Sequence, residues 1–325
     1  MKILRFIGRR TLQALVVLVL IACTNFLIVN SAPGDMVDVM AGESGAADQE
    51  YLAALREKYG LEQPLPVRLV RYLGAIATFD LGHSFRYNVP VTDLILSRFP
   101  ATLLLMFTSL GLALIGGIVL GVAAARRPGS LRDSAISVLA LLGYSTPLFW
   151  FGLMLTVLMS VKLGWLPSSG MSTIGADYSL FGHVVDVARH LVMPSVTLAL
   201  FYISTYTRLM RASMLEIYGM DFVRTAKAKG LGERRVAYGH VLRNAILPLV
   251  SLFGVQLGAV LGGSVVVEVV FGWPGLGTLA FDALFQRDLN LLMGILFMSS
   301  ALVVVVNLAV DLFYSWLDPR IEVAA

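Results

Sequence analysis

A basic segment between two hydrophobic stretches carries the most informative residue types and spacing in this chain. It reads Asp221-Phe-Val-Arg-Thr-Ala-Lys-Ala-Lys-Gly230-Leu231 and continues to Pro248. The run up to Ala228 is rich in helix formers, and Gly230 stands where a left-handed residue would end a helix. These residues are suited to contact with another protein: a short, rigid, basic helix attached at both ends to hydrophobic stretches.

Catalytic and metal-binding patterns are missing from the sequence. There is no Gly-x4-Gly-Lys-Ser/Thr phosphate loop, no His-Glu-x-x-His and no Gly-x-Ser-x-Gly. We therefore expect no catalytic residues, no cofactor bound by this chain and no ATP hydrolysis by it. The four histidines, at positions 83, 183, 190 and 240, are scattered, so we expect no metal site.

Composition indicates an integral membrane protein. The chain is 57% hydrophobic and 14% charged, with a mean hydropathy of +0.79, whereas soluble domains carry about 25% charged residues. Several stretches approach or exceed the roughly 20 apolar residues that cross a bilayer. We predict an all-α membrane protein with six transmembrane helices, the fourth of them the weakest: Ile7–Val29, Thr102–Ala125, Ala135–Val161, Leu191–Tyr206, Leu247–Val267 and Leu292–Trp316.

The distribution of lysine and arginine predicts the orientation of these spans. Basic residues precede the first span, follow the second, and are most numerous between residues 208 and 248. Short loops rich in lysine and arginine remain in the cytoplasm. We therefore expect both termini, and the segment around Arg224, to be cytoplasmic. The first span follows basic residues as a signal peptide does, but its length and the lack of a good cleavage site indicate that it is retained.

Two parts are predicted along the chain. Residues 1–97 would form the first span and an external segment, and residues 98–325 a five-helix core with a cytoplasmic loop at about 208–248. Within the external segment, Asp48–Tyr59 and Val67–Thr78 have helical spacing. These two helices could cap the bundle or form a landing surface for a partner.

The basic segment resembles the cytoplasmic coupling loop of ABC importer permeases, which docks on an ATPase subunit. Arg224-Thr-Ala226 and Gly230 match its frame, with Arg224 in place of the usual Glu. Further motifs, in the same order and spacing, are similar to the dipeptide/oligopeptide permease family along nearly the whole chain. They include Ala32-Pro-Gly-Asp35, Arg98-Phe-Pro-Ala-Thr-Leu103, Ser145-Thr-Pro-Leu-Phe-Trp-Phe-Gly152, Phe271-Gly-Trp-Pro-Gly-Leu-Gly277 and Leu317-Asp-Pro-Arg320.

The resemblance implies the type I ABC importer permease fold in a bacterial inner membrane. The implied partners are a second homologous permease, two ATPases that bind ATP and Mg, and an extracytoplasmic solute-binding protein, with no nucleic acid. Peptides are the expected solute, and nickel, opines and oligosaccharides are the alternatives within the class. The residues implied to couple to the ATPase are Asp221, Arg224, Thr225, Ala226, Lys227, Ala228, Lys229, Gly230 and Leu231.

Small and acidic residues of the fifth span are candidates for the transport pathway or for helix packing. Gly254, Gly258 and Gly262 recur every fourth residue and share one helix face. Glu268, near the outer end, could act in gating or substrate contact, or could anchor the following loop. Trp273 and other tryptophans are expected to anchor the chain at the membrane interface.

Two other protein classes are compatible with a polytopic membrane chain. An ion-coupled carrier would show paired acids or broken helices at the bilayer midplane, and a membrane-embedded enzyme would show a nucleophile with its base or a metal cluster. The sequence has no clear example of either pattern. We therefore favour the permease.

Overall fold

The computed structural model describes residues 2–31 and 63–317. The described residues form helices joined by loops, with an isolated bridge between His83 and Pro90. Contacts divide the chain into two compact units: unit 1 is residues 1–100 with 278–325, and unit 2 is residues 101–277. The C-terminal part of the chain thus groups with the first unit, and the division into residues 1–97 and 98–325 stays a prediction.

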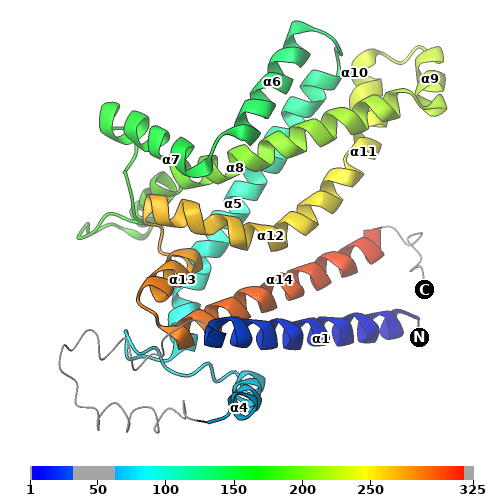
Figure 1. Cartoon of the computed structure of the whole chain (residues 1–325). Helices are drawn as coiled ribbons and strands as arrows, with labels where there is room; N and C mark the ends of the chain where they lie inside the picture. The colour runs from blue at the N-terminus through cyan, green and yellow to red at the C-terminus, as the bar shows by residue number, and fades with distance from the viewer. Residues whose placement is uncertain (1, 32–62, 318–325) are drawn as a thin grey trace. The chain divides into compact units, whose positions relative to one another are not determined.

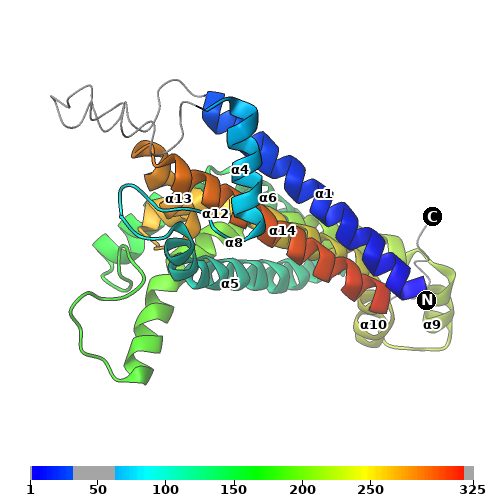
Figure 2. The ribbon, with the colours of Figure 1, turned by 90° about the horizontal axis from the view of Figure 1, so that it is seen from below.

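Unit 1 groups the C-terminal helix with the first helix because the two pack side by side. Figures 1 and 2 show α14 (Leu289–Leu317) running antiparallel to α1 (Lys2–Ser31). The buried carboxylate of Asp288 fixes the start of α14, accepting hydrogen bonds from Ser84 Oγ at 2.5 Å and from the backbone N–H of Leu291 at 3.1 Å. The unit also contains α4 (Leu65–Ala77), which confirms the helix predicted over 67–78.

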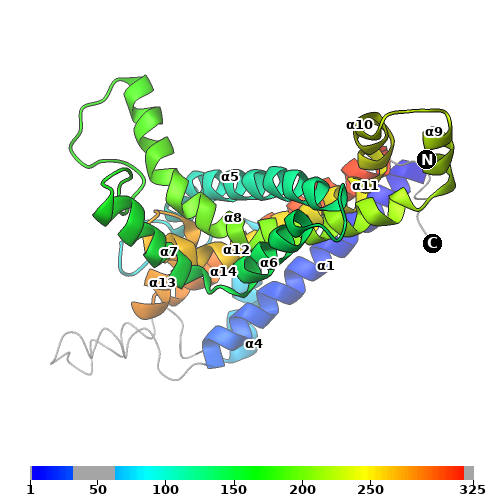
Figure 3. The same cartoon turned by 90° about the horizontal axis from the view of Figure 1, so that it is seen from above.

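Unit 2 is built around one long helix, α8 (Leu180–Tyr218). Contacts join α8 to helices before and after it in the chain, and Figure 3 shows α7 near one end of the unit and α9 near the other. Its helices are the later part of α5 (Val91–Ala125), then α6 (Leu131–Ser145), α7 (Leu148–Thr156), η1 (Val157–Lys162), α8, α9 (Asp221–Ala228), α10 (Glu233–Arg235), η2 (Val236–Val241), α11 (Leu242–Ala245) and α12 (Leu247–Phe271). The helix α13 (Leu276–Phe285) begins in unit 2 and continues into unit 1.

Glycines let α5 and α8 pack closely. A Cβ at Gly117 would collide with Tyr206, and one at Gly121 would lie 2.5 Å from Met210 Cβ. Tyr206 and Met210 are fully buried in the same core cluster. Small residues four apart permit this approach without a side chain between the two backbones.

Four described helices are long and apolar enough to cross a membrane: Gly8–Ser31, Val91–Ala125, Leu180–Tyr218 and Leu289–Val310. Three bent helix pairs also pass the test together, so the count lies between four and seven. The prediction of six spans lies within this range. The antiparallel pair α1 and α14 fits two termini on one side of the membrane, and which side that is stays a prediction.

Two predicted spans differ from the structure in detail. The third is two helices, because α6 and α7 meet at an angle of 101°. Pro147 lacks an N–H and disfavours a helical residue before it, and Thr146 is accordingly extended, at φ −80° and ψ 127°. The fourth, predicted to be the shortest, is the 39-residue helix α8, since polar residues extend the helix beyond its apolar middle and Pro194 does not end it. The helix predicted over 48–59 lies outside the described residues.

Candidate functional site

The predicted coupling segment forms a helix of its own, α9, rather than a continuation of α8. Gly219 and Met220 separate the two helices. Asp221 lies in the first turn of α9, where a negative charge favours the helix dipole. At the other end Gly230 has φ +77°, and its N–H bonds to Lys227 O at 2.9 Å. The predicted left-handed helix stop at Gly230 is thus confirmed.

The predicted coupling residues divide between two faces of α9. Val223 and Ala226 are buried against the core cluster of unit 2, and Leu231 is half-buried beside it. Asp221 and Arg224 have side chains 95% and 75% exposed, and they form a surface ion pair of 3.3 Å. The exposed members of the predicted set also include Thr225, Lys227, Ala228, Lys229 and Gly230. Apolar packing therefore holds α9 in place and leaves its charged face open.

The helical stretch that follows α9 packs against it. The stretch runs through α10, η2 and α11, and it buries Val236, Val241 and Ala245 in the same cluster as Val223. Its middle, η2, is a π-helical segment, whose backbone hydrogen bonds span five residues instead of four. Pro248 follows near the start of α12, where the missing N–H costs no helical bond. The chain is therefore helical from Glu233 to Ala245.

A cavity of about 240 Å³ lies between α9 and the ends of α5 and α8. Its lining includes Arg126, Tyr218, Lys227 and Glu233. The Lys227 ammonium lies 5.6 Å from the centre of the Tyr218 ring, a cation–π contact. The side chain of Lys227 therefore borders a space between α9 and the ends of α5 and α8.

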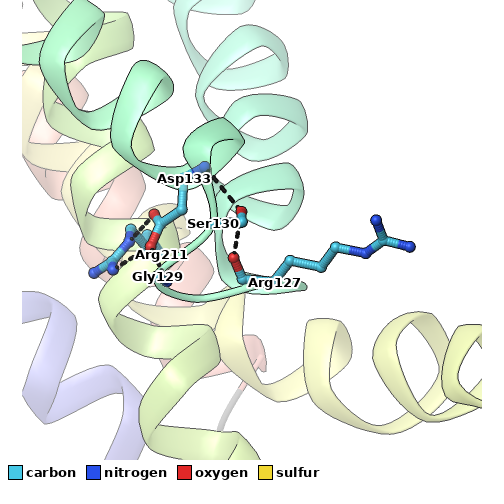
Figure 4. Close-up of polar contacts among 5 residues, drawn as sticks. All are labelled: Arg127, Gly129, Ser130, Asp133 and Arg211. Carbon is cyan, nitrogen blue, oxygen red and sulfur yellow. Dashed lines mark hydrogen bonds and ion pairs between the residues drawn. The ribbon is translucent and has the colours of Figure 1, made fainter.

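An ion pair that the sequence analysis did not single out fixes α6 to α8 in this unit. Figure 4 shows Asp133 facing Arg211, whose Nε and Nη2 donate to the two carboxylate oxygens at 2.6 and 2.8 Å. The backbone N–H of Gly129 donates to the same carboxylate at 2.9 Å. Asp133 is buried, with a side chain only 5% exposed.

The turn before α6 explains why Asp133 stands there. Ser130 caps the helix by accepting from the N–H of Asp133 at 3.3 Å, and its hydroxyl donates to Arg127 O at 2.6 Å. A Ser followed three residues later by an acid is a capping signal before an apolar run. This Ser130-x-x-Asp133 pattern is the signal that could have found the site from sequence.

The candidate Glu268 is fully buried and belongs to a hydrogen-bonded cluster. Its carboxylate accepts from Thr102 Oγ1 at 3.0 Å, and Thr102 Oγ1 in turn accepts from the Leu276 N–H at 2.7 Å. Nearby, Trp273 Nε1 donates to Ala101 O at 2.8 Å. Buried polar groups in such a chain hold one another in a single arrangement. We name these residues, Ala101, Thr102, Glu268, Trp273 and Leu276, the Glu268 cluster.

Glycines around the Glu268 cluster leave room for the carboxylate. A Cβ at Gly275 would collide with the Glu268 carboxyl group, and one at Gly277 would lie 2.6 Å from Val265 Cα. Gly272 ends α12 at φ +58°. The Phe271–Gly277 motif therefore needs its glycines for close approach and for a left-handed turn. Both points at which the chain leaves unit 2, after Gly277 and before Ala101, adjoin residues of this cluster.

One sequence prediction about this region is wrong. Trp273 was expected to be an anchor at the membrane interface, but it is fully buried and hydrogen-bonded within unit 2. An indole in a core needs a partner for its N–H, which Ala101 O provides. Composition could not distinguish this indole from that of Trp165, which is 65% exposed.

The glycine face of α12 is only partly described. Gly254 is buried within the helix, and Gly258 and Gly262 lie in the same helix within residues 258–263, of whose surroundings the structure gives no description. Their role in packing or in the pathway therefore stays a prediction.

Comparison with protein families identifies the chain. The family described as the inner membrane component of binding-protein-dependent transport systems matches residues 117–323. The chain belongs to this family. The N-terminal region of the same kind of membrane component matches residues 3–106.

Relatives of this permease align with it in sequence over almost their full lengths. It is 43% identical to the oligopeptide transport system permease protein AppB of Bacillus subtilis, over 98% of this chain and 99% of that protein. It is 37% identical to the dipeptide transport system permease protein DppB of Escherichia coli, with the same shares covered. The chain is accordingly a multi-pass permease component of the bacterial inner membrane and not itself an enzyme.

Solved structures support the fold of this permease. A chain of the MetNI methionine ABC transporter, in an inward-facing conformation, has a TM-score of 0.56 at 18% identity, covering 69% of this chain and 96% of that one. A chain of an amino acid ABC transporter has a TM-score of 0.50 at 17% identity. At these identities the match shows an ABC importer permease fold. Such a permease works with ATPase subunits and a solute-binding protein.

Proposed function

We propose that this permease forms half of the translocation pathway of an ATP-driven peptide importer of type I fold. The observation that carries the proposal is the match over 98% of the chain to permeases named for oligopeptide and dipeptide transport. A second homologous permease would form the other half. Two ATPases would bind ATP and Mg, and a solute-binding protein would deliver the peptide from outside.

The exposed face of α9 is the proposed seat of an ATPase subunit. Three features support this role: α9 is a short helix separate from α8, its apolar face is occupied by the core of unit 2, and its charged face is open. Packed rigid elements transmit domain closure as whole-body movements. Closure of the ATPases would therefore push α9 and, through η2 and α8, shift the helices that line the pathway.

Reversing the charge of the exposed face tests this role. In Arg224→Glu combined with Lys229→Glu, we expect the permease to insert and fold, but to retain less ATPase on purification and to lose ATP-driven peptide uptake. Arg132→Glu is the matched control, because Arg132 is also exposed and is predicted on the same side of the membrane. Uptake equal to that of the parent protein in the double variant would overturn the docking role of α9.

The substrate needs its own measurement. The full complex in vesicles, loaded with ATP inside, would be supplied with its binding protein and with radiolabelled di- and oligopeptides, nickel or an oligosaccharide. We expect ATP-dependent uptake of peptide. ATP-dependent uptake of another solute, with none of peptide, would keep the importer and reject the substrate.

A further inference from the structure

The outward face of α4 is apolar, which is unusual for a helix outside the predicted spans. Val67 and Val70 are 49% and 70% exposed, and Gly74 and Ala77 continue the same stripe at helical spacing. None of the residues of α4 is buried, and the helix has no acidic side chain in its sequence. An apolar stripe on a short, basic, amphipathic helix is typical of segments that lie in a membrane interface.

Contacts hold α4 at the C-terminal end of α1. Arg68 Nη2 donates to Asn30 Oδ1 at 2.5 Å, and the rings of Tyr72 and Phe26 stack with centroids 5.4 Å apart. Asn30 is the last residue but one of the candidate span Gly8–Ser31, whose mean hydropathy is 2.6. Figure 2 shows α4 beside this end of α1. The contact therefore places α4 at the depth where the hydrocarbon core ends.

Two arginines of α4 line a cavity at the same level. The cavity, of about 280 Å³, is bordered by Arg68, Arg71, Tyr72, Asp80 and Asn290 among others. Burial raises the pKa of Tyr72 to about 12, so its hydroxyl stays protonated and able to donate a hydrogen bond. The site has a net positive charge, because it contains two guanidinium groups and one carboxylate, and its other polar groups are neutral. Guanidinium groups bind phosphate oxygens in a bidentate manner.

We propose that α4 is a membrane-interface anchor, with its valine stripe among lipid acyl chains and Arg68 and Arg71 on the phosphate of an anionic phospholipid. The lipid belongs to the leaflet around the C-terminal end of α1. This assignment differs from both sequence-based possibilities for the helix, a cap on the bundle and a landing surface for a partner. It requires the membrane location of the family and does not depend on which solute is carried.

Fluorescence quenching in the full complex tests the position of the stripe. The chain has a single cysteine, Cys23, so Cys23→Ser gives a background in which Val70→Cys carries the only probe on this subunit. Two reference variants bracket the result: Leu20→Cys on the exposed face of α1 and Asn88→Cys in a loop. The complex would be placed in vesicles of phosphatidylethanolamine and phosphatidylglycerol, with brominated lipids or iodide as quenchers.

We expect the probe at position 70 to be quenched by brominated lipid, as at position 20, and to be shielded from iodide relative to position 88. Iodide quenching equal to that at position 88 would overturn the anchor. Shielding that arises only when the solute-binding protein is added would also overturn it, by making α4 a protein-docking surface.

Lipid affinity tests the two arginines. Arg68→Gln with Arg71→Gln should weaken binding of short-chain phosphatidylglycerol to the complex by about 30-fold, as measured by native mass spectrometry, since two surface charges are removed. The Lys pair at the same positions should keep most of the affinity, and inorganic phosphate should not compete. Unchanged lipid binding in the Gln pair, or full competition by inorganic phosphate, would reject a lipid headgroup site.

Discussion

The charged side chains of α9 stay exposed while apolar ones hold the helix from beneath, whereas the Glu268 cluster buries its polar groups and joins them by hydrogen bonds. Within unit 2, the C-terminal end of α12, which carries Glu268, lies far from α9 (Figure 1). An exposed charge is already solvated and is free to meet a partner, but a buried one must have its partner within the fold. The comparison indicates that α9 is built for contact and the Glu268 cluster for a fixed internal arrangement.

The largest effect should come from filling the space beside Glu268. In Gly275→Ala the new Cβ would collide with a carboxylate that cannot leave its hydrogen bonds without being buried unpaired. We expect a loss of about 3 kcal/mol in the free energy of unfolding, at the upper end for overpacking. Gly111→Ala is the control, since a Cβ there meets nothing within 4 Å. Denaturation of both purified variants in detergent would measure their free energies of unfolding. Equal values would contradict a tightly packed, fixed arrangement around Glu268.

Removing the Asp133 carboxylate should have the next largest effect. Asp133→Ala leaves Arg211 and the Gly129 N–H without their acceptor, and we expect a loss of about 2 kcal/mol because Arg211 is partly exposed and can be hydrated. Asp221→Ala provides a matched control, being also an acid in the first turn of a helix but 95% exposed. Thermal unfolding should separate them clearly. A similar loss in both would mean that burial does not decide the cost.

Deleting the indole N–H should cost less than either change. Trp273→Phe keeps most of the apolar volume but removes the indole hydrogen bond to Ala101 O, for an expected loss of about 1–2 kcal/mol. Trp165→Phe, at an exposed indole, is the control and should be neutral. Urea unfolding followed by the remaining tryptophans measures the difference. Equal urea midpoints for the two variants would show that the hydrogen bond of Trp273 does not stabilise the Glu268 cluster.

The smallest effect on stability should come from a substitution on the exposed face of α9, where we expect transport to change and stability to stay the same. Arg224→Ala removes an exposed ion pair that contributes about 0.5 kcal/mol or less. We nevertheless expect ATP-driven uptake to fall while the unfolding curve stays in place. Lys162→Ala, an exposed basic residue away from the coupling segment, should change neither quantity. A stability loss in Arg224→Ala as large as that in Trp273→Phe would contradict the assignment of α9 to contact.

The helices and helix ends that depend on neighbouring residues could be predicted from the sequence. Long apolar runs predicted α1, α14 and most of α5, and a glycine at the end of a helix-forming run predicted the stop after α9. The third span was predicted from hydrophobicity as one helix, although Pro147 lies in the middle of it. The bend of 101° follows from backbone geometry that a hydropathy average does not register.

By itself, the sequence determined the membrane class, the helical elements and the family, because apolar length, charge distribution and ordered motifs are properties of the linear chain. Only the tertiary structure decided which polar residues have partners. Asp133 meets Arg211 across 78 positions and Glu268 meets Thr102 across 166, and no local pattern encodes such distances. Trp273 and Trp165 have the same side chain, and burial in one fold is what separates their roles. The physical reason is that desolvation depends on everything packed around a group, and packing exists only once the helices have met.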